Sequence, residues 1–278
     1  MIRKIFLVDA FVDGPFTGSP TGVIFLRNPL ERSYMISLAS ELETQETLFV
    51  LLNNQSFGLR FFSQTQEIPL SVHACLAGAH LIYELGLFPV AKDLLFLTQE
   101  GQIVANTDQT GAVTLTAASQ LLTKLDQVRL DQFRTLLNYQ PGQVAWAALS
   151  PQKVIILALE KPELIKATEV NHYELTKTQA AGLAVTAQSL KPDSDYFLRC
   201  FLPLLGVNEE HVSGNIHRSL APQWGRLLQK KRLVCRQMSQ RGGLVSLELL
   251  SPAQISFTGR ATTVFKGDLK LTDIPELA

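Results

Sequence analysis

The longest apolar segment of the chain runs from Ala74 to Leu85 and contains only two clearly polar residues. An ordinary surface helix has one apolar stripe, whereas a helix that is apolar on nearly every side is normally buried. Ser71 is placed to cap the N-terminus of such a helix, and Gly86 is placed to end it in a left-handed turn. The pattern therefore predicts a short buried helix with His73 at its N-terminal end. The segment is too short to span a bilayer, which needs about 20 apolar residues.

Shorter apolar runs, separated by turn-forming residues, predict strands on both sides of this helix. These strands cover residues 3–9, 21–26, 47–52, 58–63, 94–98, 101–106, 112–116, 146–149, 153–159, 197–202, 233–238, 244–249, 253–257 and 262–265. Helical periodicity predicts further helices at residues 31–42, 130–137, 162–168, 173–181 and about 214–229. The predicted fold class is α+β.

Part of this pattern occurs twice. A strand with Leu59-Arg60 is followed by an acidic loop and a helix start at Ser71-Val-His73. The Leu-Arg pair recurs 139 residues later as Leu198-Arg199, and a second acidic loop and Ser213-Gly-Asn215 follow it. This period is too long for a solenoid and favours two like domains that face each other. Both helix N-termini would then line a cleft, and helix N-termini attract anions such as a carboxylate.

Composition narrows the classes of partner. Lys+Arg and Asp+Glu both total 25 in 278 residues, and no block of five basic residues occurs. Phosphate binding needs clustered positive charge, so we expect no nucleic-acid partner. An acid follows the first apolar run too soon for a signal peptide. The three cysteines (Cys75, Cys200 and Cys235) are widely spaced, which is typical of a reduced protein. We expect a cytoplasmic protein without a membrane partner.

Several segments carry a resemblance to a known family. They include Gly18-Ser-Pro-Thr-Gly-Val23, Gln45-Glu-Thr-Leu-Phe-Val50 and Glu67-Ile-Pro-Leu-Ser-Val-His-Ala-Cys-Leu-Ala77, and the others lie at residues 8–11, 59–63, 198–203, 206–224, 237–243 and 259–261. Taken in this order, they resemble the phenazine-biosynthesis PhzF-like proteins, whose fold is shared with diaminopimelate epimerase. Each segment alone is weak, but the ordered set covers nearly the whole chain.

The resemblance implies two similar domains related by a pseudo-twofold axis. Each would be a β-barrel-like, mostly antiparallel sheet wrapped round a central α-helix, with the active site in the cleft between them. We place the first domain at residues 1–118 plus 262–278 and the second at residues 119–261. The resemblance also implies a homodimer.

The implied chemistry is that of an isomerase that needs no cofactor and no metal, in which a glutamate moves a proton on a small anionic substrate. Glu46 matches that glutamate and His73 matches the site histidine. Glu210 lies where the family usually has an aspartate. The helix starts that would bind the substrate comprise Ser71, Val72, Ser213, Gly214 and Asn215.

Without the resemblance, these residues have plainer interpretations. Glu46 would be a solvated surface acid, and His73 would be a capping or core histidine. A metal site built from Glu209, Glu210, His211 and His217 is not expected, because the cluster lacks the i, i+4 histidine pair of a zinc helix. Arg60 and Arg199 occupy matching strands and are expected to pair with acids.

The chain departs from the family pattern at Ser19, Val72, Glu210, His211 and Asn215. One alternative is therefore a small-molecule-binding protein that keeps the fold with an altered second half-site, and another is a dimer with only a structural role. The epimerase relatives use two cysteines where this chain has serines at 71 and 213. A serine hydroxyl is too weak an acid for that two-base exchange, so amino-acid epimerisation is disfavoured.

Overall fold

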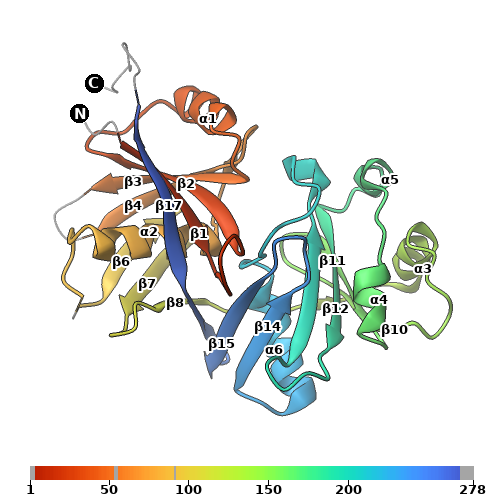
Figure 1. Cartoon of the computed structure of the whole chain (residues 1–278). Helices are drawn as coiled ribbons and strands as arrows, with labels where there is room; N and C mark the ends of the chain where they lie inside the picture. Colours follow the sequence, from red (N-terminus) through yellow and green to blue (C-terminus); the bar gives the residue numbers. More distant parts are fainter. Residues whose placement is uncertain (1–3, 53–55, 91, 270–278) are drawn as a thin grey trace. The chain divides into compact units, whose positions relative to one another are not determined.

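The computed structural model describes residues 4–52, 56–90 and 92–269 (Figure 1). Strands predominate and helices are few, so the predicted α+β class is confirmed. The chain divides into two compact units, one formed by residues up to Ala117 together with those from Ser256 onward, and the other by Ala118–Ile255. No described helix has the length and hydropathy needed to cross a membrane.

The first unit contains a sheet and the two helices α1 and α2. Its elements are β1 (Lys4–Ala10), β2 (Ser19–Leu26), α1 (Arg32–Glu41), β3 (Glu46–Leu52), β4 (Phe57–Phe62), β5 (Glu67–Ile68), α2 (Val72–Glu84), β6 (Leu94–Thr98), β7 (Gly101–Thr107), β8 (Val113–Ala118), β16 (Gln254–Gly259) and β17 (Ala261–Asp268). Strand β1 pairs antiparallel with β17 and with β2. Beyond β2 the order is β3 (parallel), β4 (antiparallel), β6 (parallel) and β7 (antiparallel).

Helix α2 is the buried helix predicted from the sequence. It contacts β1, β2, β3, β7 and β17, and it lies among these strands in Figure 1. From Val72 to Tyr83 every residue except His80 is buried. The Ser71 hydroxyl accepts a hydrogen bond from the Ala74 amide at 3.3 Å, and Gly86 has a left-handed φ of 65°. The predicted cap and helix end are therefore both confirmed.

A small residue lets α2 approach the sheet closely. A Cβ atom added at Gly78 would lie 2.7 Å from Cδ2 of Leu48 on β3. The separation between α2 and β3 therefore depends on the missing side chain, because carbon atoms do not pack at that distance.

The second unit has its own sheet and core. Its elements are β9 (Thr123–Lys124), α3 (Gln127–Leu136), β10 (Val144–Leu149), β11 (Val154–Leu159), α4 (Glu163–Ala167), α5 (His172–Thr176), β12 (Gly182–Gln188), β13 (Tyr196–Phe201), a 3₁₀ turn (Pro203–Leu205), α6 (His217–Leu228), β14 (Arg232–Gln237) and β15 (Gly243–Ser251). Phe133 of α3, Ile165 of α4 and Leu175 of α5 pack on one face of this sheet, in a core that includes Leu157 and Val185.

The two units repeat one order of strands. In the second unit β10 pairs antiparallel with β11, then β12 (parallel), β13 (antiparallel), β14 (parallel) and β15 (antiparallel) follow. The first unit has the same alternation from β1 to β7. Helix α2 connects β4 to β6, and α6 connects β13 to β14. The sequence echo of Leu59-Arg60 and Leu198-Arg199 therefore belongs to a repeat that extends through each unit.

The expectations from the sequence need correction at several elements of the second unit. Strand β12 was not predicted, and the helix expected over residues 173–181 ends at Thr176. Three of the seven residues of β12 are Gly or Ala, which have low strand propensity, and burial between β11 and β13 overrides that preference. Helix α6 begins at His217 rather than at about Gly214, because a tight turn precedes it.

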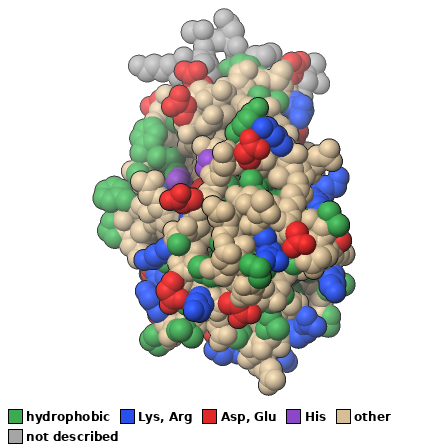
Figure 2. Space-filling model, turned by 90° about the vertical axis from the view of Figure 1, so that its right-hand side faces the viewer, with side chains coloured by type: hydrophobic (Ala, Val, Ile, Leu, Met, Phe, Trp, Pro, Cys, Tyr) green, Lys and Arg blue, Asp and Glu red, His purple; other side chains and the backbone are tan. Residues whose placement is uncertain are grey.

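Charge is distributed evenly over the surface that Figure 2 shows. Lys and Arg side chains alternate there with Asp and Glu side chains, and no large area carries a single sign. This view agrees with the formal net charge of zero. It offers no basic surface of the kind that binds a phosphate backbone.

Candidate active site

Glu46 is the first residue of β3. The chain reaches it from β2 through α1, and the parallel register places Thr21 of β2 opposite Glu46. The hydroxyl of Thr44 donates to the Glu46 carbonyl oxygen at 2.9 Å and so fixes the entry to the strand. Glu46 is 8% exposed. The plainer interpretation, a solvated surface acid, is therefore wrong.

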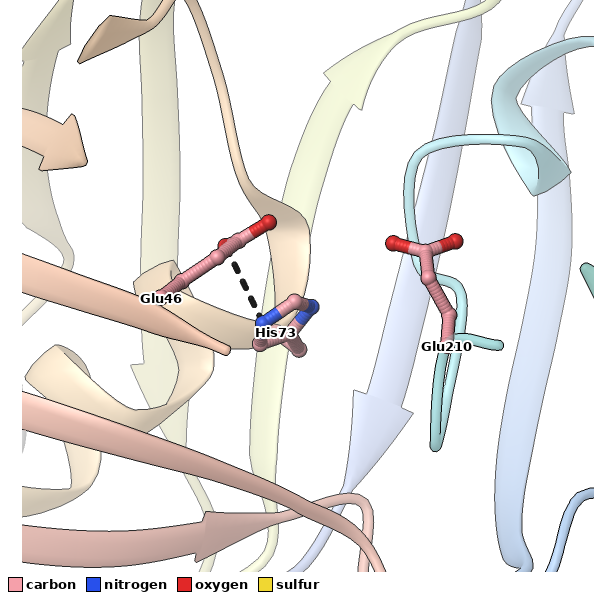
Figure 3. A group of neighbouring side chains, drawn as sticks. All are labelled: Glu46, His73 and Glu210. Carbon is pink, nitrogen blue, oxygen red and sulfur yellow. Dashed lines mark ion pairs between the residues drawn. The ribbon is translucent and has the colours of Figure 1, made fainter. Parts of the chain in front are cut away.

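His73 lies in the first turn of α2 and is buried. Its Nε2 atom is 3.0 Å from Oε2 of Glu46, and the contact is an ion pair when the imidazole is protonated (Figure 3). The structure therefore brings together two candidate residues that the sequence places on different elements. Ser71 and Val72, which precede His73, are also buried.

Two hydroxyls of β2 lie on the same side of the sheet as the Glu46 side chain. Ser19 and Thr21 are separated by one residue and so face the same side of the strand, and Thr21 is the parallel neighbour of Glu46. Both side chains are fully buried, and neither hydroxyl oxygen has a hydrogen-bond partner among the described residues. Buried polar atoms without partners are rare and mark places where a ligand or an ordered water binds. The sequence singled out Ser19 only as a departure from the family and missed Thr21.

In the second unit, Glu210 lies in the loop between β13 and α6 (Figure 3). Its amide donates to the carbonyl of Cys200 at 2.8 Å, and its own carbonyl accepts a bond from the Gln237 side chain at 3.3 Å. The Oε1 atom of Gln237 also accepts from the Ser213 amide at 3.4 Å. Gln237 thus connects the loop to β14 through two hydrogen bonds. The sequence showed Gln237 only as part of the 237–243 segment of the family resemblance and did not suggest this role.

The thiol of Cys200 lies beneath this loop. Burial raises its pKa well above the ordinary value, and the nearby Glu210 carboxylate raises it further. A thiol with a raised pKa is a poor nucleophile at neutral pH. Cys200 is therefore a packed side chain next to Glu210 rather than a candidate catalytic group.

The start of α6 differs from the start of α2. The amides of His217 and Arg218 donate to the carbonyls of Gly214 and Asn215 at 3.3 and 3.1 Å, and no side chain caps the helix. Ser213 and Gly214 are buried and Asn215 is partly exposed. The residues predicted to bind substrate here thus form a turn before the helix.

The residues of the alternative metal cluster have other partners. Arg199 donates two hydrogen bonds to the Glu209 carboxylate, and the Tyr196 hydroxyl lies 2.7 Å from Nδ1 of His217. Burial lowers the pKa of His217 to about 3, so its imidazole is neutral. Within either unit, no group of three or more His, Cys, Asp or Glu side chains among the described residues is arranged to hold a metal ion.

Comparison with known proteins identifies the family. A model of the phenazine biosynthesis-like proteins (PhzC-PhzF) matches residues 8–267. The chain belongs to this family. The resemblance inferred from the ordered segments is thereby confirmed.

Relatives in the phenazine biosynthesis-like family cover almost the whole chain. A Pseudomonas aeruginosa protein named an uncharacterized isomerase is 32% identical over 265 residues, which are 95% of this chain and 97% of the relative. A Halalkalibacterium halodurans protein with the same description is 29% identical over 98% of this chain and 100% of the relative. The crystal structure of a PhzF family protein from Enterococcus faecalis, 28% identical, matches with a TM-score of 0.86 over 98% of this chain and 100% of that one.

Proposed function

We propose that this member of the phenazine biosynthesis-like family is an isomerase that uses no cofactor and moves a proton on a small carboxylate-bearing substrate. The observation that carries the proposal is the buried contact between Glu46 and His73. Supporting it, relatives that match nearly the whole chain are named isomerases.

Glu46 is the proton-transfer group. A carboxylate accepts a proton from a carbon acid and, once protonated, returns it to a different carbon, so one residue serves as base and then as acid. Its burial excludes competing water, which strengthens its interaction with a bound substrate.

His73 positions the substrate. Its imidazole contacts Glu46 and lies in the first turn of α2, where the helix dipole favours negative charge. This positive end of the helix dipole would stabilise a substrate carboxylate at the Ser71–His73 turn. The buried hydroxyls of Ser19 and Thr21 supply further hydrogen bonds to oxygen atoms of the same substrate.

We extend the proposal to the second half-site. Glu210 would assist proton transfer, and Ser213, Gly214 and Asn215 would bind the far end of the substrate across the cleft between the predicted domains. The predicted assembly is a homodimer in the cytoplasm, and we propose no nucleic-acid or membrane partner.

The test is proton exchange at carbon. A panel of small carboxylic acids, including amino, hydroxy and unsaturated cyclic acids, is incubated with the protein in deuterated water and followed by proton NMR. We expect one class to lose a C–H signal or to rearrange, and Glu46→Gln to slow that loss by about 10²–10⁴. Wild-type exchange by Glu46→Gln would refute the assignment.

A second function is a binding protein that has lost turnover. It is favoured by the uncapped start of α6, which differs from the Ser71-capped start of α2. A panel member that raises the melting temperature without any deuterium incorporation would support this alternative. The structural-dimer hypothesis predicts neither effect.

A further inference from the structure

Each unit contains an arginine that donates two hydrogen bonds to the carboxylate of one glutamate. On β4, Nε and Nη2 of Arg60 donate to Oε1 and Oε2 of Glu67 at 2.7 and 2.8 Å. On β13, Nε and Nη2 of Arg199 donate to Oε1 and Oε2 of Glu209 at 2.7 and 3.0 Å. A bidentate pair fixes the orientation of the carboxylate as well as its distance.

Two further features recur in both copies. Each guanidinium lies over the ring of the phenylalanine two residues along its strand, Phe62 at 5.2 Å and Phe201 at 4.9 Å. Each glutamate also lies four residues before the serine of the next helix start, Ser71 or Ser213. The same nitrogen atoms, ring position and spacing therefore occur twice in the repeat.

Further hydrogen bonds connect the two Arg–Glu pairs to other parts of the chain. Nη1 of Arg199 also donates to the carbonyls of Ile165 and Thr168, at 3.1 and 2.7 Å, so this guanidinium joins the Glu209 loop to α4. Glu67 accepts further bonds from Arg32 and Gln99. The hydrogen bond from Arg60 also lowers the pKa of Glu67, which keeps the acid ionised near neutral pH.

We propose that Arg60 and Arg199 are positioning residues that orient the two loops carrying the candidate site residues, Arg60 for the Ser71–His73 turn and Arg199 for Glu210. The geometric part of this inference holds without any activity, and only its meaning for catalysis rests on the proposed function. Glu209 is the direct chain neighbour of Glu210, so the two hydrogen bonds from Arg199 to its carboxylate anchor the loop next to Glu210. Glu67 similarly begins the short β5 strand that leads into Ser71.

The test uses Arg60→Lys and Arg199→Lys, which keep the charge but lose the bidentate geometry. Amide hydrogen exchange is measured at Ala74, whose N–H donates to Ser71, and at Glu210, whose N–H donates to Cys200. We expect Arg60→Lys to speed exchange about tenfold at Ala74 and less than about twofold at Glu210, and Arg199→Lys to do the reverse. NMR titration of the His73 imidazole and the Glu210 carboxyl should shift in the same selective way, because a moved group changes its electrostatic surroundings.

The matched control is Arg232→Lys, which alters an exposed pair with Glu248 in the second unit and should change neither site. If a lysine variant does not fold, Glu67→Gln or Glu209→Gln replaces it with little change in shape. A variant that lowers the melting temperature but leaves its own loop's exchange and titration unchanged would overturn the proposal. Equal changes at both loops from either variant would also overturn it, because they would indicate general destabilisation.

Discussion

The imidazole Nε2 of His73 lies 3.0 Å from a carboxylate oxygen of Glu46, and this contact joins the first turn of α2 to the first residue of β3. Both groups are attached to regular secondary structure rather than to long loops. A carboxylate held in this way can transfer a proton repeatedly without rearrangement of the backbone, which is the requirement for efficient general acid–base chemistry.

Shortening the acid should disrupt this geometry while keeping its charge. We expect Glu46→Asp to slow the proton exchange described above by about 10²-fold, since a displacement of about 1 Å can cost that much. The control is Glu41→Asp, an exposed acid at the end of α1, which should leave the rate unchanged. A wild-type rate for Glu46→Asp would show that the carboxylate does not need this placement.

Removing the buried hydroxyl of Thr21 should stabilise the protein and impair ligand binding. A valine places a methyl group where an unpartnered hydroxyl is now desolvated, and we expect a gain of about 1 kcal/mol in the free energy of unfolding. Urea denaturation measures this gain. The control is Thr114→Val, because the Thr114 hydroxyl bonds that of Thr258 at 2.8 Å and its loss should destabilise by about 1 kcal/mol. A loss of stability for Thr21→Val would indicate that a bound water already satisfies the hydroxyl.

Acid should destabilise the protein through His217. Burial lowers the pKa of this histidine from 6.5 to about 3. Between these two pH values the histidine is protonated in the unfolded chain but neutral in the folded protein. Stability is then highest above pH 6.5 and falls as the pH drops toward 3, by up to about 1.4 kcal/mol per pH unit. His217→Gln should flatten this dependence over the same pH range, as followed by urea denaturation at several pH values. An unchanged slope in the variant would assign acid sensitivity to other groups.

The N-cap of α2 should contribute to both stability and the site. We expect Ser71→Ala to lower the free energy of unfolding by about 1 kcal/mol, because the Ala74 amide loses its acceptor in a buried place. Ser71→Thr keeps a hydroxyl and should recover most of that loss. Thermal and urea denaturation of the pair separates the cap from the change in side-chain volume, and equal stability of both variants would argue against a capping role.

Local signals in the sequence determined the central helix and the repeat. The apolar run after Ala74, the cap at Ser71 and the end at Gly86 act within a few residues of one another, so each can be recognised without knowing the fold. The expected pairing of Arg60 and Arg199 with acids is likewise confirmed, with Glu67 and Glu209 as the partners. That pairing was predicted because the same short pattern recurs in both halves of the chain.

Tertiary structure alone decided the features that depend on long-range pairing. Strand β12 contains residues of low strand propensity and forms because β11 and β13 cover both its edges. Thr21 joined the candidate site only through the β2–β3 register, and a shift of one residue would have turned it to the other side of the sheet. The distance between Glu46 and His73 likewise results from the packing of α2 against β3. Such contacts depend on how elements that are distant in sequence pack together. Capping signals and hydrophobic periodicity act within one element and do not determine that packing.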